Sequence, residues 1–295
     1  MAEVAPYAPR RIDLTFRLGK GSFGEDGSTQ LTFKGLRVVA YIELATAPHP
    51  ALARLRIYGL TLDHMNQLSR AGLSYKARTD LIQVDAGDDV TGLSTVFVGQ
   101  IIDAYPDMRN QPDVSFYVYA TPTNVAQLRP VTPTSFTGST TTEPALKAIA
   151  VKGNWTLENT GVNTALQTPY FQGTAWDQLL SCVRAANCFA HVDGITNILA
   201  VWPKDGARNS LNEIIVSPDT GMIGYPTFQA TLVIVKRLYD NKTIQMGQVI
   251  QILSELTAAN GRFTVITISY DLASELPQGP WEMTMLCNPK DPLPQ

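Results

Sequence analysis

Two stretches near the end of the chain decide the fold: SPDTGMIGYPTF at residues 217–228 and NGRFTVITISYDLASELPQGPWEMTMLC at residues 260–287. Between residues 214 and 287 apolar and polar residues alternate with a period of two, and Gly and Pro interrupt the runs. A period of two is typical of a strand that buries one face. The region holds no plausible pairing of a nucleophile with a base, so we expect a β-structure built to contact other proteins.

Residues 1–121 predict a second β-rich unit. Alternate residues from Ile12 to Leu18 are apolar, which is the pattern of a half-buried strand. Further strands are predicted at residues 31–33, 36–44, 53–60, 80–85, 94–105 and 114–120. Thr61 can cap a short helix that ends near Gly72. One helix among so many strands favours a small barrel or sandwich with the helix at one end.

The middle of the chain departs from this period. Residues 121–142 are rich in Thr, Pro and Ser, and residues 122–135 are predicted to form a linker. Pro144 lies near the start of one predicted helix and Gly153 ends it. Thr174 and Asp177 have the spacing of a capping box for a second helix. Short strands are predicted at residues 155–158, 189–192 and 198–202.

The predicted fold class is therefore mainly β with a small α+β insertion. Its predicted parts are a first β unit (1–121), a linker (122–135), an α+β insertion (136–213), a second β unit (214–287) and a flexible tail (288–295). The two β units share no sequence repeat, but they can still be structural duplicates because barrels tolerate wide sequence divergence.

The composition narrows the class of protein. Charged residues make up 17% of the 295 residues, while Gly and Pro number 21 and 19. A low charge together with many turn-forming residues favours a β protein whose surface is partly covered by partner proteins. A net charge of −3 argues against a nucleic-acid binder. No signal-peptide core and no run of 18 apolar residues occurs, so we expect a protein made and kept in a cytoplasm, without membrane insertion.

One motif resembles a nucleotide site and fails on its context. LGKGSFG at residues 18–24 spells the glycine-rich loop of a protein kinase. The valine expected after its last glycine is Asp26, which would repel phosphate, and Glu43 stands where the strand lysine belongs. No HRD or DFG follows. A hairpin turn between two strands is the better interpretation.

The histidines and cysteines do not have the spacing of a catalytic or metal-binding site. The chain has three histidines and three cysteines: His49, His64, His191, Cys182, Cys188 and Cys287. The histidines are widely spaced, which argues against a metal site, and the cysteines are predicted to be free, buried thiols. We expect no catalytic residue, no metal and no cofactor, and hence not an enzyme.

Asp85, Asp88 and Asp89 form a small acidic cluster. A calcium loop needs more oxygen ligands and a distal Glu, so a solvated turn is the better interpretation. An acidic face would also suit the wall of a channel that passes DNA, because it repels phosphate. We therefore carry these three residues forward as candidates for a lumen.

Aromatic and methionine side chains in the second β unit are the candidates for an assembly interface. Core packing is an equally good interpretation, because these residue types are enriched both in cores and at interfaces. The candidates are Tyr225, Phe228, Trp281, Met283 and Met285.

The order and character of several segments resemble the baseplate-hub proteins of bacteriophage tails, a group that includes the late-control protein D family. These segments are residues 35–69 (GLRVVAYIELATAPHPALARLRIYGLTLDHMNQLS), 95–107 (TVFVGQIIDAYPD), 114–121 (VSFYVYAT), 141–163, 169–187 and 217–287. Together they cover nearly the whole chain, while no single residue is a strict signature.

The resemblance implies two β-barrel domains like those of tail tubes, an α/β insertion between them, and a homotrimer. Three copies would present six barrels as a pseudo-hexameric ring that meets a hexameric tube and keeps three-fold symmetry for the central spike. The implied partners are the chain itself, the tail tube protein and the central spike, with tape measure and baseplate wedge proteins as further candidates. DNA would pass through only in transit, without specific binding. The implied location is the virion tail tip, after assembly in the host cytoplasm.

Three other functions stay open at this point. A carbohydrate-binding adhesin would need an exposed aromatic platform, and the four tryptophans are dispersed along the chain. The hub of a cellular contractile injection system is barely separable from a phage hub by sequence. An enzyme has no constellation to build on.

Overall fold

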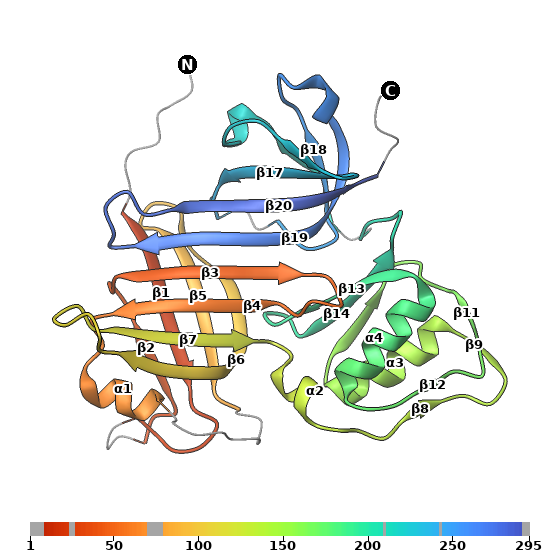
Figure 1. Ribbon diagram of the computed structural model, residues 1–295, viewed down its shortest axis with the longest axis horizontal. Helices are drawn as coiled ribbons and strands as arrows, with labels where there is room; N and C mark the ends of the chain where they lie inside the picture. Colours follow the sequence, from red (N-terminus) through yellow and green to blue (C-terminus); the bar gives the residue numbers. More distant parts are fainter. Residues whose placement is uncertain (1–8, 24–26, 70–78, 209–210, 242–243, 291–295) are drawn as a thin grey trace.

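The structure is a computed structural model, and it describes residues 9–23, 27–69, 79–208, 211–241 and 244–290. Two β units lie edge to edge, and a smaller module of helices and short strands lies beside them (Figure 1). No helix in these described ranges is long and apolar enough to cross a membrane.

The described part of the first β unit contains seven strands and one helix. They are β1 (Arg10–Arg17), β2 (Gln30–Phe33), β3 (Val38–Ala45), β4 (Leu52–Tyr58), α1 (Leu62–Leu68), β5 (Leu81–Asp88), β6 (Gly92–Asp107) and β7 (Ser115–Thr121). The strands pair in the order β3-β4-β7-β6-β5-β1-β2. β1 and β2 are antiparallel neighbours, which confirms the hairpin predicted around the kinase-like loop.

The predicted cap of α1 is confirmed: the Thr61 side chain accepts a hydrogen bond from the backbone N–H of His64 at 3.3 Å. The helix ends at Leu68, and the predicted end near Gly72 lies outside the described residues.

In the second β unit the described residues form six strands and two short 3₁₀ turns. They are β15 (Ile214–Val216), η1 (Pro218–Thr220), β16 (Thr227–Gln229), β17 (Leu232–Leu238), β18 (Val249–Ile252), η2 (Thr257–Ala259), β19 (Gly261–Ser274) and β20 (Trp281–Pro289). The main order is β16-β17-β20-β19, and β18 pairs with β19 and with β15. Alternate residues of β17, of β20 and of residues 266–272 in β19 are buried, as the period of two predicts.

A seam between β19 and β3 joins the two units into one sheet. The two strands pair antiparallel from Thr267 opposite Ala45 to Ser274 opposite Val38. One hydrophobic core runs behind the seam, with side chains such as Ile42 and Ile268 fully buried on either side of it. The predicted fold class, mainly β with an α+β insertion, is confirmed, and the two β units share a sheet and a core.

Within the described residues the insertion contains three helices and several short strands. Its elements are α2 (Asn124–Leu128), β8 (Thr134–Ser135), β9 (Ser139–Thr141), α3 (Thr142–Gly153), β10 (Thr156–Asn159), β11 (Ala165–Gln167), β12 (Tyr170–Phe171), α4 (Ala175–Ala186), β13 (Cys188–Asp193) and β14 (Ile198–Pro203). The capping box predicted for α4 is confirmed: Thr174 Oγ1 accepts from Asp177 N at 3.1 Å, and Asp177 Oδ2 accepts from Thr174 N at 3.0 Å. α3 ends at Gly153, as predicted.

Strand β14 attaches the insertion to the β units because both of its faces are buried. Leu199 and Val201 belong to the core of the insertion, whereas Ala200 and Trp202 belong to the core of the β units. An alternating strand therefore contributes to two cores at once. The insertion is held to the rest of the chain by apolar packing and not only by its chain connections.

Candidate functional site

The outer face of the shared sheet carries a continuous row of polar side chains from strand to strand. Side chains directly opposite each other in a ladder lie on the same face. One such row runs across the seam from β20 to β6 and consists of Glu282, Asp271, Tyr41, Arg54, Tyr119 and Asp103. We call this surface the sheet face. It belongs to both β units, because the seam aligns their strands.

The sheet face is acidic on the side of the second unit. Asp271 lies directly opposite Glu282, and burial together with this like charge raises the pKa of Asp271. Lys236 forms an ion pair with Glu282 and relieves part of the repulsion. Like charges directly opposite each other destabilise a sheet, so this pair is a candidate for a functional role.

On the side of the first unit, the sheet face carries arginines set among tyrosines. The guanidinium of Arg56 lies 5.2 Å from the ring centre of Tyr117 and 5.5 Å from that of Tyr58. Tyr105 stacks on Tyr117 with ring centres 5.5 Å apart. Rings and guanidinium groups held this way lose little conformational entropy on binding, and Tyr and Arg are enriched among residues that dominate binding energy.

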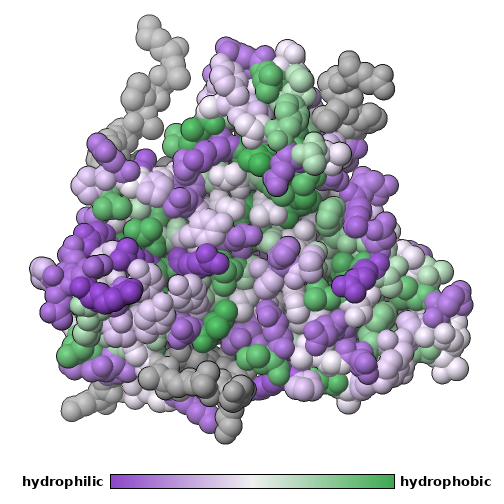
Figure 2. Space-filling model, viewed as in Figure 1, coloured by the Kyte–Doolittle hydropathy of each residue, from purple (hydrophilic) through white to green (hydrophobic). Residues whose placement is uncertain are grey.

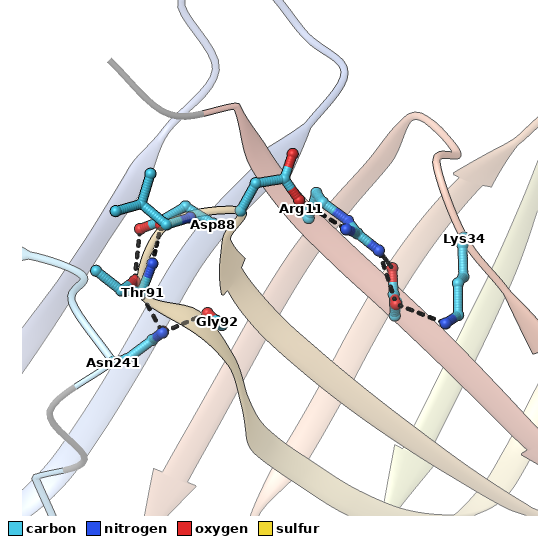
Figure 3. A network of polar contacts seen from close by, with 9 residues as sticks. Arg11, Lys34, Asp88, Thr91, Gly92 and Asn241 are labelled. Atoms are coloured by element: carbon cyan, nitrogen blue, oxygen red, sulfur yellow. Dashed lines mark hydrogen bonds and ion pairs between the residues drawn. The ribbon is translucent and has the colours of Figure 1, made fainter. Parts of the chain in front are cut away.

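The predicted acidic cluster lies in the β5–β6 hairpin, where its carboxylates have partners within the chain. Asp85 accepts hydrogen bonds from Gln83 and, at 2.6 Å, from the hydroxyl of Thr95. Asp89 forms an ion pair with Arg11 at 2.6 Å, and Arg11 also contacts Asp13 (Figure 3). Their role in a lumen stays a prediction.

The third member of that cluster, Asp88, holds the hairpin turn. Its carboxylate accepts from the backbone N–H groups of Val90 and Thr91 and from the Thr91 hydroxyl. Burial acts to raise the pKa of Asp88, but these hydrogen bonds prevail and lower it. Asn241 of the second unit donates to Thr91 and to the carbonyl of Gly92, so this turn also ties the two units together (Figure 3).

The five interface candidates divide into two groups. Tyr225 and Phe228 are 63% and 48% exposed. Trp281, Met283 and Met285 are buried inside the chain, because they occupy the inward positions of β20. These three side chains therefore contribute to the core of the β units and not to the surface.

Exposed apolar side chains gather on the second unit, a set that the sequence did not single out beyond Tyr225 and Phe228. Figure 2 shows apolar surface over this upper part of the molecule. Tyr225 is fixed by a 2.9 Å hydrogen bond from its hydroxyl to Glu255. The set is Ile215, Tyr225, Phe228, Leu238, Leu253 and Leu256.

No three His, Cys, Asp or Glu side chains gather as metal ligands within the described ranges. Burial raises the pKa of Cys182 to about 12 and that of Cys188 to about 11, so both are thiols at neutral pH. His49 lies in the β3–β4 loop and His64 in the first turn of α1, both as expected. The ring of His64 packs edge-on against Phe33.

His191 lies in a different setting from the other two histidines. It is buried, and its Nδ1 lies 2.9 Å from the carbonyl oxygen of Ala45 in β3, which links the insertion to the first unit. Its ring lines a cavity of about 250 Å³ between the insertion and both β units, together with Arg208 and Tyr270. Burial lowers the pKa of His191, although the Ala45 carbonyl and Asp193 oppose this shift.

We expect acidification to destabilise the fold through His191. Its folded-state pKa lies below the unfolded value of about 6.5, so stability is complete above that pH and is lost as pH falls towards the folded pKa. His191→Asn keeps a donor for Ala45 and removes the titration. Urea unfolding at about pH 7.5 and about pH 5.5 should show a larger loss for the wild type than for the variant. Equal losses would contradict this role.

Comparisons with known proteins agree with the fold. The family model for baseplate hub gp41 matches residues 11–278. A search among curated proteins finds no match.

Three solved structures have a similar fold at about a tenth of sequence identity. The tail protein of Neisseria meningitidis MC58 has a TM-score of 0.61 at 10% identity, over 94% of this chain and 96% of its own. The 43 kDa tail protein of prophage MuSo2 from Shewanella oneidensis has a TM-score of 0.60 at 10% identity, over 97% and 98%. The E. coli c3393 protein is a component of the type VI secretion system and is described as similar to the T4 tail proteins gp27 and gp5. It has a TM-score of 0.60 at 9% sequence identity, over 88% of this chain and 76% of its own.

Proposed function

Because the chain belongs to the baseplate hub gp41 family, we propose that it forms a homotrimeric ring that joins the tail tube to the central spike. The observation that carries the proposal is the family match over residues 11–278, nearly the whole chain. Family membership makes the protein a structural component of the phage tail. The trimer, the ring and its channel are our proposal.

The shared sheet supports this arrangement. Each chain contributes two β units fused along the β19–β3 seam, so three chains would contribute six units. Six similar units can face a hexameric tube, while the three chains keep three-fold symmetry towards a spike. On this proposal the tube and spike proteins are direct partners, with tape measure and wedge proteins as further ones. The ring would assemble in the host cytoplasm.

We assign the wall of the channel to the sheet face. Asp271 and Glu282 would repel DNA phosphates there and keep the passing duplex from adhering. Two carboxylates directly opposite each other destabilise the sheet. This loss of stability is explained if their negative charge helps DNA to pass through the channel. DNA would then be in transit only, with no specific binding.

We further propose that the protein acts without catalysis or cofactor. The described cysteines are buried thiols, and the one buried histidine is engaged with a backbone carbonyl. The charged and aromatic side chains of the sheet face suit recognition of a partner. The described residues of this face do not place a nucleophile beside a base.

A hub of a cellular contractile injection system is the second candidate. The similarity of the fold to the type VI secretion component c3393 favours it. Neighbouring genes for a capsid or a terminase would decide for the phage, and their absence together with a sheath ATPase gene would decide for the injection system.

The proposal is tested by the mass of the purified full chain in solution. Light scattering coupled to size exclusion, followed by electron microscopy of the peak, should give three chains in a ring with pseudo-six-fold outline. Co-expression with the spike gene tests whether the ring forms only when the spike protein is present as a template. A particle that stays monomeric in both preparations would contradict the ring.

A further inference from the structure

The cavity beside His191 lies where the insertion meets both β units. Its volume is about 250 Å³, and all three parts line it, with His191 from β13, Val96 from β6, and Met246 and Tyr270 from the second unit. These four side chains are buried, whereas Ile195, which also lines the cavity, is 43% exposed. The cavity therefore has a closed floor and opens to solvent beside Ile195. Figure 1 shows β13 next to the end of β3, where the insertion meets the sheet.

Two buried polar atoms on this wall have no hydrogen-bond partner among the described residues. His191 uses its Nδ1 to donate to the carbonyl oxygen of Ala45, so in the neutral ring Nε2 is an acceptor without a donor. The hydroxyl of Tyr270, in β19, makes no hydrogen bond with a described residue. Unlike the indole nitrogen of Trp202, neither atom is sealed among packed side chains, so both face open space.

The charged groups at the cavity favour a neutral occupant. Arg208 lines it, but its Nε and Nη2 already bind the carboxylate of Glu158. Asp193 lines it too, and its carboxylate accepts two hydrogen bonds from the loop that follows β13. Asp193 would repel an anion, and a cation would have to share carboxylates that already have donors.

The size and the apolar part of the wall favour an organic molecule over water alone. Leu44, Val96, Ile244 and Met246 contribute hydrocarbon surface, which offers a water molecule no partner. An apolar cavity of about 150 Å³ is large enough to hold a benzene ring. Drug-sized ligands occupy pockets of about 300–1,000 Å³. A molecule with one ring is therefore the size that fits here.

We propose that this cavity binds a small neutral molecule that carries a hydroxyl group on an apolar ring, as in a phenol. The ligand hydroxyl would donate to Nε2 of His191 and accept from the hydroxyl of Tyr270, which supplies both buried groups with a partner. The ring would lie against Val96 and Met246 and leave water. The ligand would contact the insertion and both β units at once. The site does not depend on the homotrimer, so its test can fail while the proposed function stands.

Calorimetric titration of the full chain at about pH 7.5 tests the site, with phenol as the probe and toluene as the same ring without a hydroxyl. We expect one phenol to bind per chain. Tyr270→Phe keeps the aromatic ring and removes the hydroxyl, so it should weaken phenol binding about tenfold and leave toluene binding unchanged. The matched control is Tyr225→Phe, the same change at a 63% exposed position, which should bind both probes as the wild type does.

Methyl NMR of the wild-type chain gives the location of the probe even if Tyr270→Phe fails to fold. With labelled methionine methyl groups, the signal of Met246, assigned through Met246→Leu, should shift during the phenol titration. The signal of Met108, which is 41% exposed and follows β6, should not.

The outcomes decide the proposal in either direction. A loss of affinity for phenol alone in Tyr270→Phe, together with the shift of Met246, supports it. An equal loss for phenol and toluene would show a changed cavity shape and overturn the role of the hydroxyl. A wild-type chain without saturable phenol binding would overturn the site, and so would binding that shifts Met108 and not Met246.

Discussion

Replacing Arg208 with Ala is expected to lower the free energy of unfolding by about 2–3 kcal/mol. The Arg208 side chain is 9% exposed, and its Nε and Nη2 each donate to the Glu158 carboxylate at 2.7 Å. Its Nη1 donates to the carbonyl of Met246, so one side chain links the insertion to the second β unit. The substitution removes the two hydrogen bonds that the Glu158 carboxylate accepts from Arg208. Because Glu158 stays 28% exposed, water offsets part of the loss, which sets the estimate below that for a fully buried pair.

Urea unfolding of Arg208→Ala and Arg262→Ala measures this effect against a matched control. Arg262 also binds a carboxylate with two nitrogens, that of Glu213, but its side chain is 43% exposed. An exposed pair contributes at most about 1 kcal/mol, so Arg262→Ala should change stability little. Equal losses in the two variants would contradict the role assigned to Arg208.

Trp202→Ala should cost about 3–5 kcal/mol and weaken the coupling between insertion and β units. Trp202 is completely buried in the core of the β units and packs against Phe189 with ring centres 6.0 Å apart. It lies on β14, whose other face belongs to the insertion. Removing the indole leaves a cavity between the two parts, so unfolding should broaden into two transitions. Urea titration followed by circular dichroism measures both effects.

Two further variants give the controls. Trp202→Phe should cost less, about 1–2 kcal/mol, because it keeps an aromatic ring and removes an indole N–H that finds no hydrogen-bond partner among the described residues. Leu199→Ala opens a cavity in the insertion core only and should weaken the insertion itself. A Trp202→Ala protein that unfolds in one transition at the wild-type midpoint would exclude this account of how the insertion is attached.

Secondary structure could be predicted from the sequence where it is determined by residues that are close together in the chain. Alternation predicted β17 and β19, and the spacing of Thr174 and Asp177 predicted the start of α4. The seam could not be predicted, because it pairs residues about 230 positions apart and any apolar strand could have filled either place. The opposition of Asp271 and Glu282 follows from the register of the β19–β20 pair, which no composition argument supplies.

Which of the interface candidates are exposed was predicted only in part, for the same reason. Aromatic and methionine residues of β20 were candidates by type, but Met283 and Met285 lie on its inward face. Phe228 is exposed on β16, which pairs with β17 alone among the described strands, so its exposure depends on sheet order and not on residue type. The Thr- and Pro-rich segment predicted as a linker holds α2 and β8, and Val131 packs on the insertion core.

Electron cryo-microscopy of the intact tail tip tests the central claim most directly. The account predicts three copies of this chain in a ring between the tube and the spike, with six β units around the channel and Asp271 and Glu282 facing it. A ring with another number of copies, or a position outside the channel axis, would contradict the account.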